Sequence, residues 1–351
     1  MSSSQKRYLF GRRTASVFDP NFKFQIDTRN LSTGSSASNQ YKIPLVSEQT
    51  EPITIHWGDG NSDIITTWNQ SETTHTYAVE GVYNIIVDGV VNGFQYNNSG
   101  DKLKQLDITN WGEFNSLLTR VFWGCNNLTS LAEDIGWINS LVNGINMFRD
   151  NSLTSLPDVM ELPLLIFSIS MFRSNSLTSL PSGMELPVLT NGNSMFFDNS
   201  LTSLPIGMEL PLLTNGNGMF TNNSITSLPD VMELPMLTGG VLMFYRNFIT
   251  NLPSGMSLPV LTNGNGMFSN NSLTSLPDVM ELPVLTNGNG MFFNNTINTT
   301  RYSQLLIDLE DLNPNDNVTF DGGNSKYNLA GEIARDALIA RGWIITDGGL
   351  E

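Results

Sequence analysis

The residues best suited to chemistry are few, and most of them lie between positions 53 and 77. Asp59, Asn61 and Asp63 have the i, i+2, i+4 spacing of the first ligands in a calcium loop. The twelfth position of such a loop needs a bidentate glutamate, and here that position is Gln70. We therefore treat this segment as a calcium candidate that lacks its strongest ligand, and we expect no bound metal and no cofactor.

The remaining reactive side chains do not form a catalytic pattern. The chain has one cysteine, Cys125, and two histidines, His56 and His75, which have no serine or cysteine in a motif beside them. One cysteine excludes an intrachain disulfide and a cysteine-rich zinc site. A glycosidase needs two carboxylates set apart by position, whereas many acids here recur at one spacing. We expect no catalytic residue and no enzymatic activity, and a polysaccharide-degrading enzyme is kept only as the third functional class.

A 24-residue repeat dominates the chain. Each unit contains a Leu-Pro corner, a second proline and, in most copies, an Asn-Gly pair, and all three are turn signals. Three corners in 24 residues predict a flattened coil. One coil buries too few apolar side chains to offset the backbone entropy of ordering it, so coils must stack. The repeat is marked most clearly by the pair Met-Phe, which begins at 147, 171, 195, 219, 243, 267 and 291.

The two residues after each Met-Phe pair do not follow the repeat. We expect them outside the core, on one exposed strip along the stack, although drift at unconstrained surface positions explains the variation equally well. Aromatic residues beside Asn, Asp and Arg suit stacking on sugar rings or contact with a protein. A second departure, the apolar segment 239–242, marks a candidate contact patch. The predicted binding residues are Arg149, Arg173, Phe197, Thr221, Tyr245, Arg246 and Phe293.

An asparagine follows each variable pair at the same place in every coil. We expect an internal ladder whose side-chain amides bond to backbone groups left free at a turn, with a polar binding stripe as the alternative. A recurring glutamate must be solvated or must hold cations, because stacked like charges repel. The predicted ladder consists of Asn151, Asn175, Asn199, Asn223, Asn247, Asn271 and Asn295.

The repeat unit resembles a known family. Met-Phe followed by Asn-Ser-Leu-Thr-Ser-Leu-Pro is similar to the leucine-rich repeats of BspA-like surface proteins, over roughly residues 117–300. Such repeats are often found in bacterial surface proteins and in phage-encoded proteins. The resemblance implies a curved solenoid used for adhesion or recognition, without catalysis. The Asn-Gly-Asn-Gly turn and the double proline are departures that leave the curvature open.

Residues 20–105 carry a different pattern. Residues 53–56 and 81–87 alternate apolar and polar side chains between turn signals, which predicts a small β-sandwich. Trp57-Gly-Asp-Gly60, with His75-Thr-Tyr77 and Gly81-Val-Tyr83, resembles the polycystic kidney disease (PKD) type of immunoglobulin-like domain. That resemblance implies an extracellular or virion-surface spacer or binding module.

The repeat stops after residue 300. The pattern that follows predicts helices over 302–312 and 330–341 and strands at 317–320 and 343–346. We expect these elements to cap the open end of the stack. The predicted fold class is mainly β: a small immunoglobulin-like β-sandwich, a leucine-rich-repeat solenoid of 24-residue coils, and an α/β C-terminal cap. The predicted domains are a basic N-terminal arm at 1–19, the PKD-like β-sandwich at 20–105, the solenoid at 106–300 and the cap at 301–351.

The charge and hydropathy of the chain limit its expected partners and location. Acidic residues outnumber basic ones by 33 to 17, a net charge of −16 that disfavours nucleic acid as a partner. No stretch reaches the roughly 18 apolar residues of a membrane span, and the N-terminus lacks the apolar core of a secretory signal. The first 18 residues carry four bases and no acid, which indicates either a solvated tail or an arm for virion attachment through Lys6, Arg7, Arg12 and Arg13.

These features together indicate a non-enzymatic phage virion protein on the surface of a capsid or tail, which adheres to the host surface or decorates the particle. Its expected partners are other virion proteins, reached through the N-terminal arm or the PKD-like domain, and a host surface glycan or protein. A homo-oligomer is compatible with this hypothesis. The alternative is a bacterial cell-surface or secreted extracellular adhesin.

Overall fold

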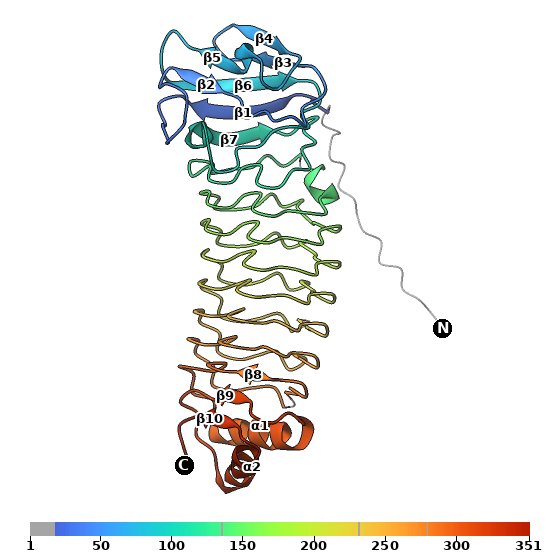
Figure 1. Cartoon of the computed structure of the whole chain (residues 1–351), viewed down its shortest axis with the longest axis vertical. Coiled ribbons are helices and arrows are strands. Elements are labelled where there is room, and N and C mark those ends of the chain that lie inside the picture. Colours follow the sequence, from blue (N-terminus) through green and yellow to red (C-terminus); the bar gives the residue numbers. More distant parts are fainter. Residues whose placement is uncertain (1–17, 135, 231, 279) are drawn as a thin grey trace, which may run out of the picture.

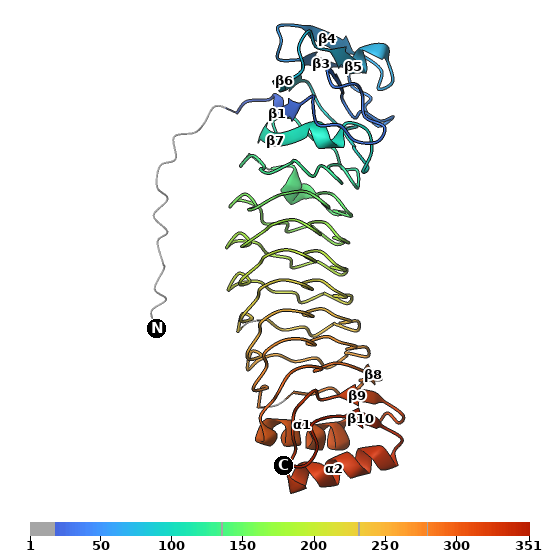
Figure 2. The ribbon, with the colours of Figure 1, turned by 90° about the vertical axis from the view of Figure 1, so that its left-hand side faces the viewer.

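The computed structural model describes residues 18–134, 136–230, 232–278 and 280–351. The molecule is an elongated column, with a small sheet region at one end, two helices at the other and a pile of similar coils between them (Figure 1; Figure 2). We call residues 120–298 the coil stack. The predicted attachment residues lie outside the described residues: Lys6, Arg7, Arg12 and Arg13.

The N-terminal end is built on one five-stranded antiparallel sheet in the order β4-β3-β6-β1-β7. Phe24 of β1 pairs with Ile85 of β6 and with Ile108 of β7, so the buried residues of three neighbouring strands share one face. A separate ribbon joins β2 and β5. The strands are β1 (Phe22–Asp27), β2 (Gln40–Lys42), β3 (Ile53–His56), β4 (Ser62–Ile65), β5 (Thr74–Thr76), β6 (Val82–Asp88) and β7 (Gln105–Asn110).

Strand β7 joins this sheet to the coil stack. On one side it pairs with β1, and on the other Asp107 forms a parallel bridge with Ser130 of the first coil. The N–H of Tyr96 also donates to the carbonyl of Val121, at 2.9 Å. One hydrophobic cluster therefore runs from Phe22 to Trp343 through both regions.

Consecutive coils lie on one another at a constant offset. Parallel bridges link residues 24 positions apart, from Asn143 with Phe167 to Asn263 with Asn287. A phenylalanine of each coil stacks on the next, with ring centroids 5.6–5.7 Å apart and planes within 9° of parallel. This fully buried column consists of Phe122, Phe148, Phe172, Phe196, Phe220, Phe244, Phe268 and Phe292.

The backbone is left-handed on both sides of each Met-Phe pair. Gly, Asn and Asp adopt this conformation at least cost, which explains why they fill most of these places. The residue before Met has φ between 52° and 63° in Asn146, Ser170, Ser194, Gly218, Leu242, Gly266 and Gly290. The second variable residue has φ between 53° and 58° in Asp150, Ser174, Asp198, Asn222, Arg246, Asn270 and Asn294.

The predicted fold class is wrong. The described residues contain two α-helices and ten strands, and these strands lie in small sheets of five, three and two strands rather than in a leucine-rich-repeat solenoid or an immunoglobulin-like sandwich. In the described part of the coil stack, regular pairing before β8 (Asn287–Gly288) is limited to isolated bridges. The physical reason is that two prolines and two left-handed residues interrupt each 24-residue coil, which leaves no run long enough for an extended strand.

The C-terminal end closes the stack with α1 (Thr299–Leu312) and α2 (Leu329–Ala340), which confirm the two predicted helices. Asn298 and Asn328 cap them by accepting hydrogen bonds from N–H groups of the first turn. A parallel sheet continues the stacking beyond the last coil. Its strands are β8 (Asn287–Gly288), β9 (Thr319–Asp321) and β10 (Ile344–Thr346).

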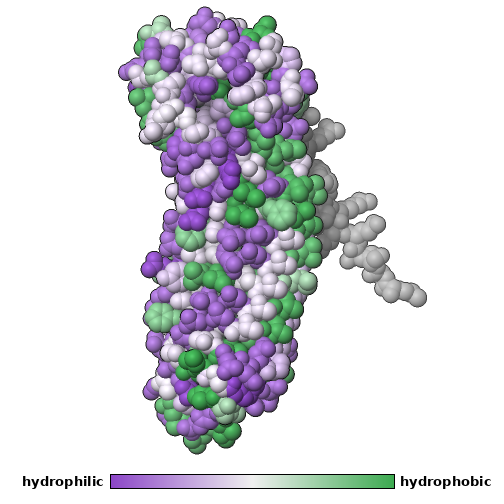
Figure 3. All heavy atoms as spheres, in the orientation of Figure 1, coloured by the Kyte–Doolittle hydropathy of each residue, from purple (hydrophilic) through white to green (hydrophobic). Residues whose placement is uncertain are grey.

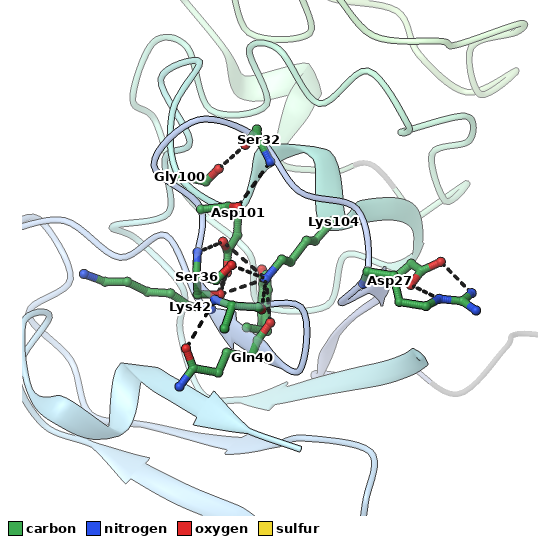
Figure 4. Close-up of polar contacts among 12 residues, drawn as sticks. Asp27, Ser32, Ser36, Gln40, Lys42, Gly100, Asp101 and Lys104 are labelled. Atoms are coloured by element: carbon green, nitrogen blue, oxygen red, sulfur yellow. Dashed lines mark hydrogen bonds and ion pairs between the residues drawn. The ribbon is translucent and has the colours of Figure 1, made fainter. Parts of the chain in front are cut away.

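A buried lysine fixes the loop between β1 and β2 (Figure 4). The ammonium group of Lys104, which has no solvent exposure, donates to the carbonyls of Ser36, Ala37 and Gln40 at 3.2, 2.9 and 2.7 Å. Its Nζ lies 3.6 Å from the carboxylate of Asp101, which also accepts from the backbone N–H of Ser36 and Lys42. Burial lowers the pKa of the Lys104 ammonium, although Asp101 acts in the opposite direction.

Candidate functional site

The variable pairs lie along one side of the coil stack, directly after the buried phenylalanine column. Their exposure differs between coils: Arg246 and Asn222 are exposed, Phe197 and Tyr245 are half-buried, and Phe293 is 53% exposed. We call these pairs the variable strip, from Arg149 and Asp150 to Phe293 and Asn294. The same backbone conformation therefore presents a different side chain at each level of the stack.

Arginines and aromatic rings contact each other within the variable strip. The guanidinium of Arg173 lies 4.3 Å from the centroid of the Phe197 ring in the next coil. Arg246 lies 5.2 Å from the ring of its neighbour Tyr245. Arg149 lies 5.2 Å from the ring of Trp123, one coil before it. These cation–π contacts hold the long side chains against the stack and leave donors on the guanidinium edges.

Thr221 differs from the other predicted binding residues. It is only 3% exposed, and its hydroxyl donates to the carbonyl of Leu242 in the next coil. The expected exposed position is thus a contact between coils. Its hydroxyl is not free to bind a ligand, because its proton is directed at the carbonyl of Leu242.

Charge is divided between two parts of the coil stack. The region 106–300 contains four basic residues, and three of them belong to the variable strip: Arg149, Arg173 and Arg246. The fourth is Arg120, whose guanidinium lies 5.9 Å from the ring of Trp123. Acids concentrate instead around the two prolines of most coils, with residues 253–259 as an exception. Examples are Glu209, Asp230 and Glu233, which line an open pocket of about 340 Å³ that shares no residue with the strip. The strip also carries Asp150 and Asp198, so it has a net charge of +1, whereas the acidic proline side repels anionic ligands.

The asparagine ladder joins each coil to the one before it. The amide of Asn247 donates to the carbonyls of Phe220 and Phe244, at 2.9 and 3.2 Å, and its oxygen accepts from the N–H of Ile225 at 3.0 Å. The same three bonds recur at the equivalent asparagines Asn175, Asn199, Asn223, Asn271 and Asn295. At the C-terminal end, the hydroxyl of Ser325 accepts from Ile297 in place of the next asparagine.

Asn151 does not take part in this ladder. Its amide nitrogen and oxygen are buried and have no hydrogen-bond partner among the described residues. The coil before it is irregular, since Phe122 and Phe148 are 26 residues apart instead of 24. The carbonyl of Phe122 accepts instead from the N–H of Cys125, at 3.4 Å.

The ladder leads to a testable prediction for Asn247. Replacing it by alanine leaves the buried N–H of Ile225 without a partner, so we expect a loss of about 1–3 kcal/mol in unfolding free energy. The carbonyls of Phe220 and Phe244 lose one donor each but keep the amides of the neighbouring ladder asparagines. Asn251 of the same coil is exposed, and among the described residues its side chain bonds only to the hydroxyl of Thr250. Asn251→Ala, measured by the same urea denaturation, is the control and should change stability by less than about 0.5 kcal/mol. Equal effects in the two variants would contradict this role of the ladder.

The calcium candidate uses its side chains for contacts within the N-terminal sheet region. The carboxylate of Asp59 accepts from the side chain of Asn61 at 3.0 Å and lies 2.9 Å from Nε2 of His75. Partial burial raises the pKa of Asp59, but these bonds outweigh it and hold the pKa below its usual value. Asp63 accepts from the indole of Trp57 at 2.7 Å. Across the described ranges, no three His, Cys, Asp or Glu side chains form a group able to hold a metal ion.

The other two groups singled out in the sequence have structural surroundings. Cys125 is fully buried, and burial raises the pKa of its thiol. The ring of His75 stacks on Trp57, with centroids 5.0 Å apart. Both residues therefore contribute to packing, and neither lines the pocket given above for the described residues.

Sequence reasoning missed Phe248. This side chain is 59% exposed and follows the ladder residue Asn247. The signal was present in the repeat, because the equivalent residue is serine in most coils, for example Ser200, Ser224 and Ser272. Attention to departures outside the two variable positions would have found it.

A second surface feature repeats regularly. Figure 3 shows an apolar band along one edge of the coil stack, next to a face on which polar and apolar residues alternate. Exposed apolar residues also recur directly after the second proline of several coils, as Leu164, Leu212, Met236 and Val284. Because this feature is nearly the same in each coil, it distinguishes no level of the stack from another.

Comparison with known proteins assigns neither a family nor a function to the variable strip. The sequence matches no protein-family model, and no curated protein is significantly similar to it. Among the described helices, none has the length and apolar character required to cross a membrane.

Proposed function

We propose that this protein is a non-enzymatic recognition protein on the surface of a phage particle, which uses the variable strip to adhere to a host surface component. The observation that carries the proposal is the strip itself. Seven coils repeat their core almost without change, while the pair after each Met-Phe differs at every level. A constant scaffold with varied, partly exposed aromatic and arginine residues is suited to recognition of an extended ligand.

The location on a phage particle rests on the resemblances in the sequence. The repeat unit is similar to that of BspA-like surface proteins, and the Trp57-Gly-Asp-Gly60 segment is similar to PKD-type domains. The column shape supports the same proposal, since the coil stack, which carries the strip, separates the sheet region from the cap (Figure 2). The N-terminal arm at 1–19, of which residues 1–17 lie outside the described residues, is the proposed attachment segment.

Mass spectrometry of particles purified from an infected culture tests the location. We expect the protein at a constant copy number per particle after density-gradient purification. Its recovery from the envelope fraction of uninfected cells, and not from particles, would instead support the bacterial adhesin.

Adhesion is tested separately with the purified protein. The triple variant Phe197→Ala, Tyr245→Ala and Phe293→Ala removes the aromatic side chains of the variable strip, and we expect at least a tenfold loss of binding to host cells. The control is Ile206→Ala, which removes an apolar side chain that is 87% exposed but lies beside Pro205 on the acidic side. Binding that falls equally in both proteins, or in neither, would exclude the strip as the adhesive surface.

A further inference from the structure

One coil departs from the repeat at more positions than its neighbours. Residues 241 and 242 are Val and Leu where the preceding coil has Asn217 and Gly218, and residue 248 is Phe where that coil has Ser224. Residues 245 and 246 are Tyr and Arg. All of these residues lie in residues 239–251, which we call the divergent coil.

Two of these departures occupy places that the backbone makes costly. Leu242 has φ 57° and Arg246 has φ 53°, whereas the equivalent places elsewhere hold Gly, Asn, Asp or Ser. Left-handed backbone is unfavourable for side chains of this size. Strained residues of this kind cluster at functional sites, because the structure retains them in spite of their cost.

The divergent coil borders an open groove of about 430 Å³. The groove is lined by the side chains of Asn222, Ser224, Arg246, Phe248 and Asn270, together with three ladder asparagines. Arg246 and Phe248 are its only cation and its only aromatic ring. A volume of this size is within the range of sites that bind small ligands.

Several polar groups of this groove have capacity to bind a ligand. Within the ranges that the structure describes, the guanidinium of Arg246 makes neither an ion pair nor a hydrogen bond, and Ser224 uses its hydroxyl in none. Asn222 donates to the carboxylate of Asp198 at 2.6 Å, which leaves its own Oδ1 as an acceptor. The groove therefore offers charged donors, a hydroxyl and an amide oxygen beside an exposed ring.

We infer that this groove binds an acidic sugar residue through its carboxylate, a specificity that rests on the proposed adhesive function. A guanidinium pairs with a carboxylate through two parallel hydrogen bonds. The exposed face of Phe248 packs on the apolar face of a pyranose ring, and Ser224 and Asn222 bond to its hydroxyl groups. A neutral sugar gains the ring contact but leaves the arginine unpaired.

The test uses the full chain and two matched probes, a trimer of galacturonic acid and the corresponding neutral galactose trimer, measured by isothermal titration calorimetry. We expect the acidic trimer to bind at least tenfold more tightly, with an affinity that falls as salt is raised. Arg246→Asn and Phe248→Ser introduce the residues found in neighbouring coils. Each should weaken acidic-trimer binding at least tenfold, and Arg246→Asn should leave the melting temperature equal or higher because it relieves a left-handed arginine.

Ile206→Ala is the control, because it removes an apolar side chain that is 87% exposed and lies outside both the groove and the variable strip. It should retain the full affinity for the acidic trimer. No binding of the acidic trimer, equal binding of the neutral trimer, or unchanged binding in Arg246→Asn would overturn the assignment. If host-cell adhesion survives Arg246→Asn and Phe248→Ser while the trimer is not bound, the sugar assignment fails and the adhesive function stands.

Discussion

Replacing Lys104 by methionine is expected to lower the unfolding free energy by about 3–5 kcal/mol. Methionine fills much of the volume of the lysine stem but has no charge and no donor. The carboxylate of Asp101 then remains buried without its cation, and the carbonyls of Ser36, Ala37 and Gln40 lose a shared donor. Urea denaturation followed by the fluorescence of the buried Trp57 measures this loss.

Two further variants separate the buried charge from other effects of the substitution. Lys102→Met changes a partly exposed lysine two residues away and should cost less than about 0.5 kcal/mol. Adding Asp101→Asn to Lys104→Met removes the unpaired charge, so the double variant should be more stable than the sum of the single losses indicates. Strict additivity would show that the two charges do not interact.

Phe220→Ala is expected to have an effect of similar size, because Phe220 lies in the middle of the phenylalanine column. Removing the ring opens a cavity between Phe196 and Phe244, whose centroids lie 5.7 and 5.6 Å from its own. Truncation of a fully buried phenylalanine costs about 3–5 kcal/mol. Thermal and urea denaturation of the purified variant provide the measurement.

The control for this variant is Phe293→Ala in the variable strip. Phe293 is half-exposed and makes no stacking contact with another ring among the described residues. We expect its loss to change the unfolding free energy by less than about 1 kcal/mol. A loss comparable to that of Phe220→Ala would mean that the strip contributes to the core, and it would weaken the proposed adhesive role.

The period and the order of the regions could be predicted from the sequence, because each depends on local signals that repeat. Met-Phe at a spacing of 24 predicts stacked coils, and the helical spacing of residues 302–312 predicts α1. The fold class could not be predicted in the same way. A short Leu-Thr-Ser-Leu segment pairs as a strand only if the residues around it keep the backbone extended. The left-handed backbone conformations of those residues are fixed only when the coils pack.

The candidate site was predicted only in part for a related reason. Variation within a repeat identifies positions whose side chains need not pack in the core, and Arg246 and Phe293 at such positions are exposed. It does not show which varied side chains turn toward the next coil, as Thr221 does. Phe248 lies outside the varied pair, and its importance follows from the groove that it borders.

The asparagine ladder also makes the coils interchangeable. Asn199, Asn223 and Asn247 make the same three bonds, so any coil that carries this asparagine can follow any other. In-frame recombination between repeats would then lengthen or shorten the column by about one ring spacing, 5.6 Å, without a new interface. Loss of residues 219–242, for example, would bring Phe197 next to Tyr245 and create a new neighbouring pair from existing parts. Binding surfaces in such a chain can therefore diversify by rearrangement as well as by point substitution.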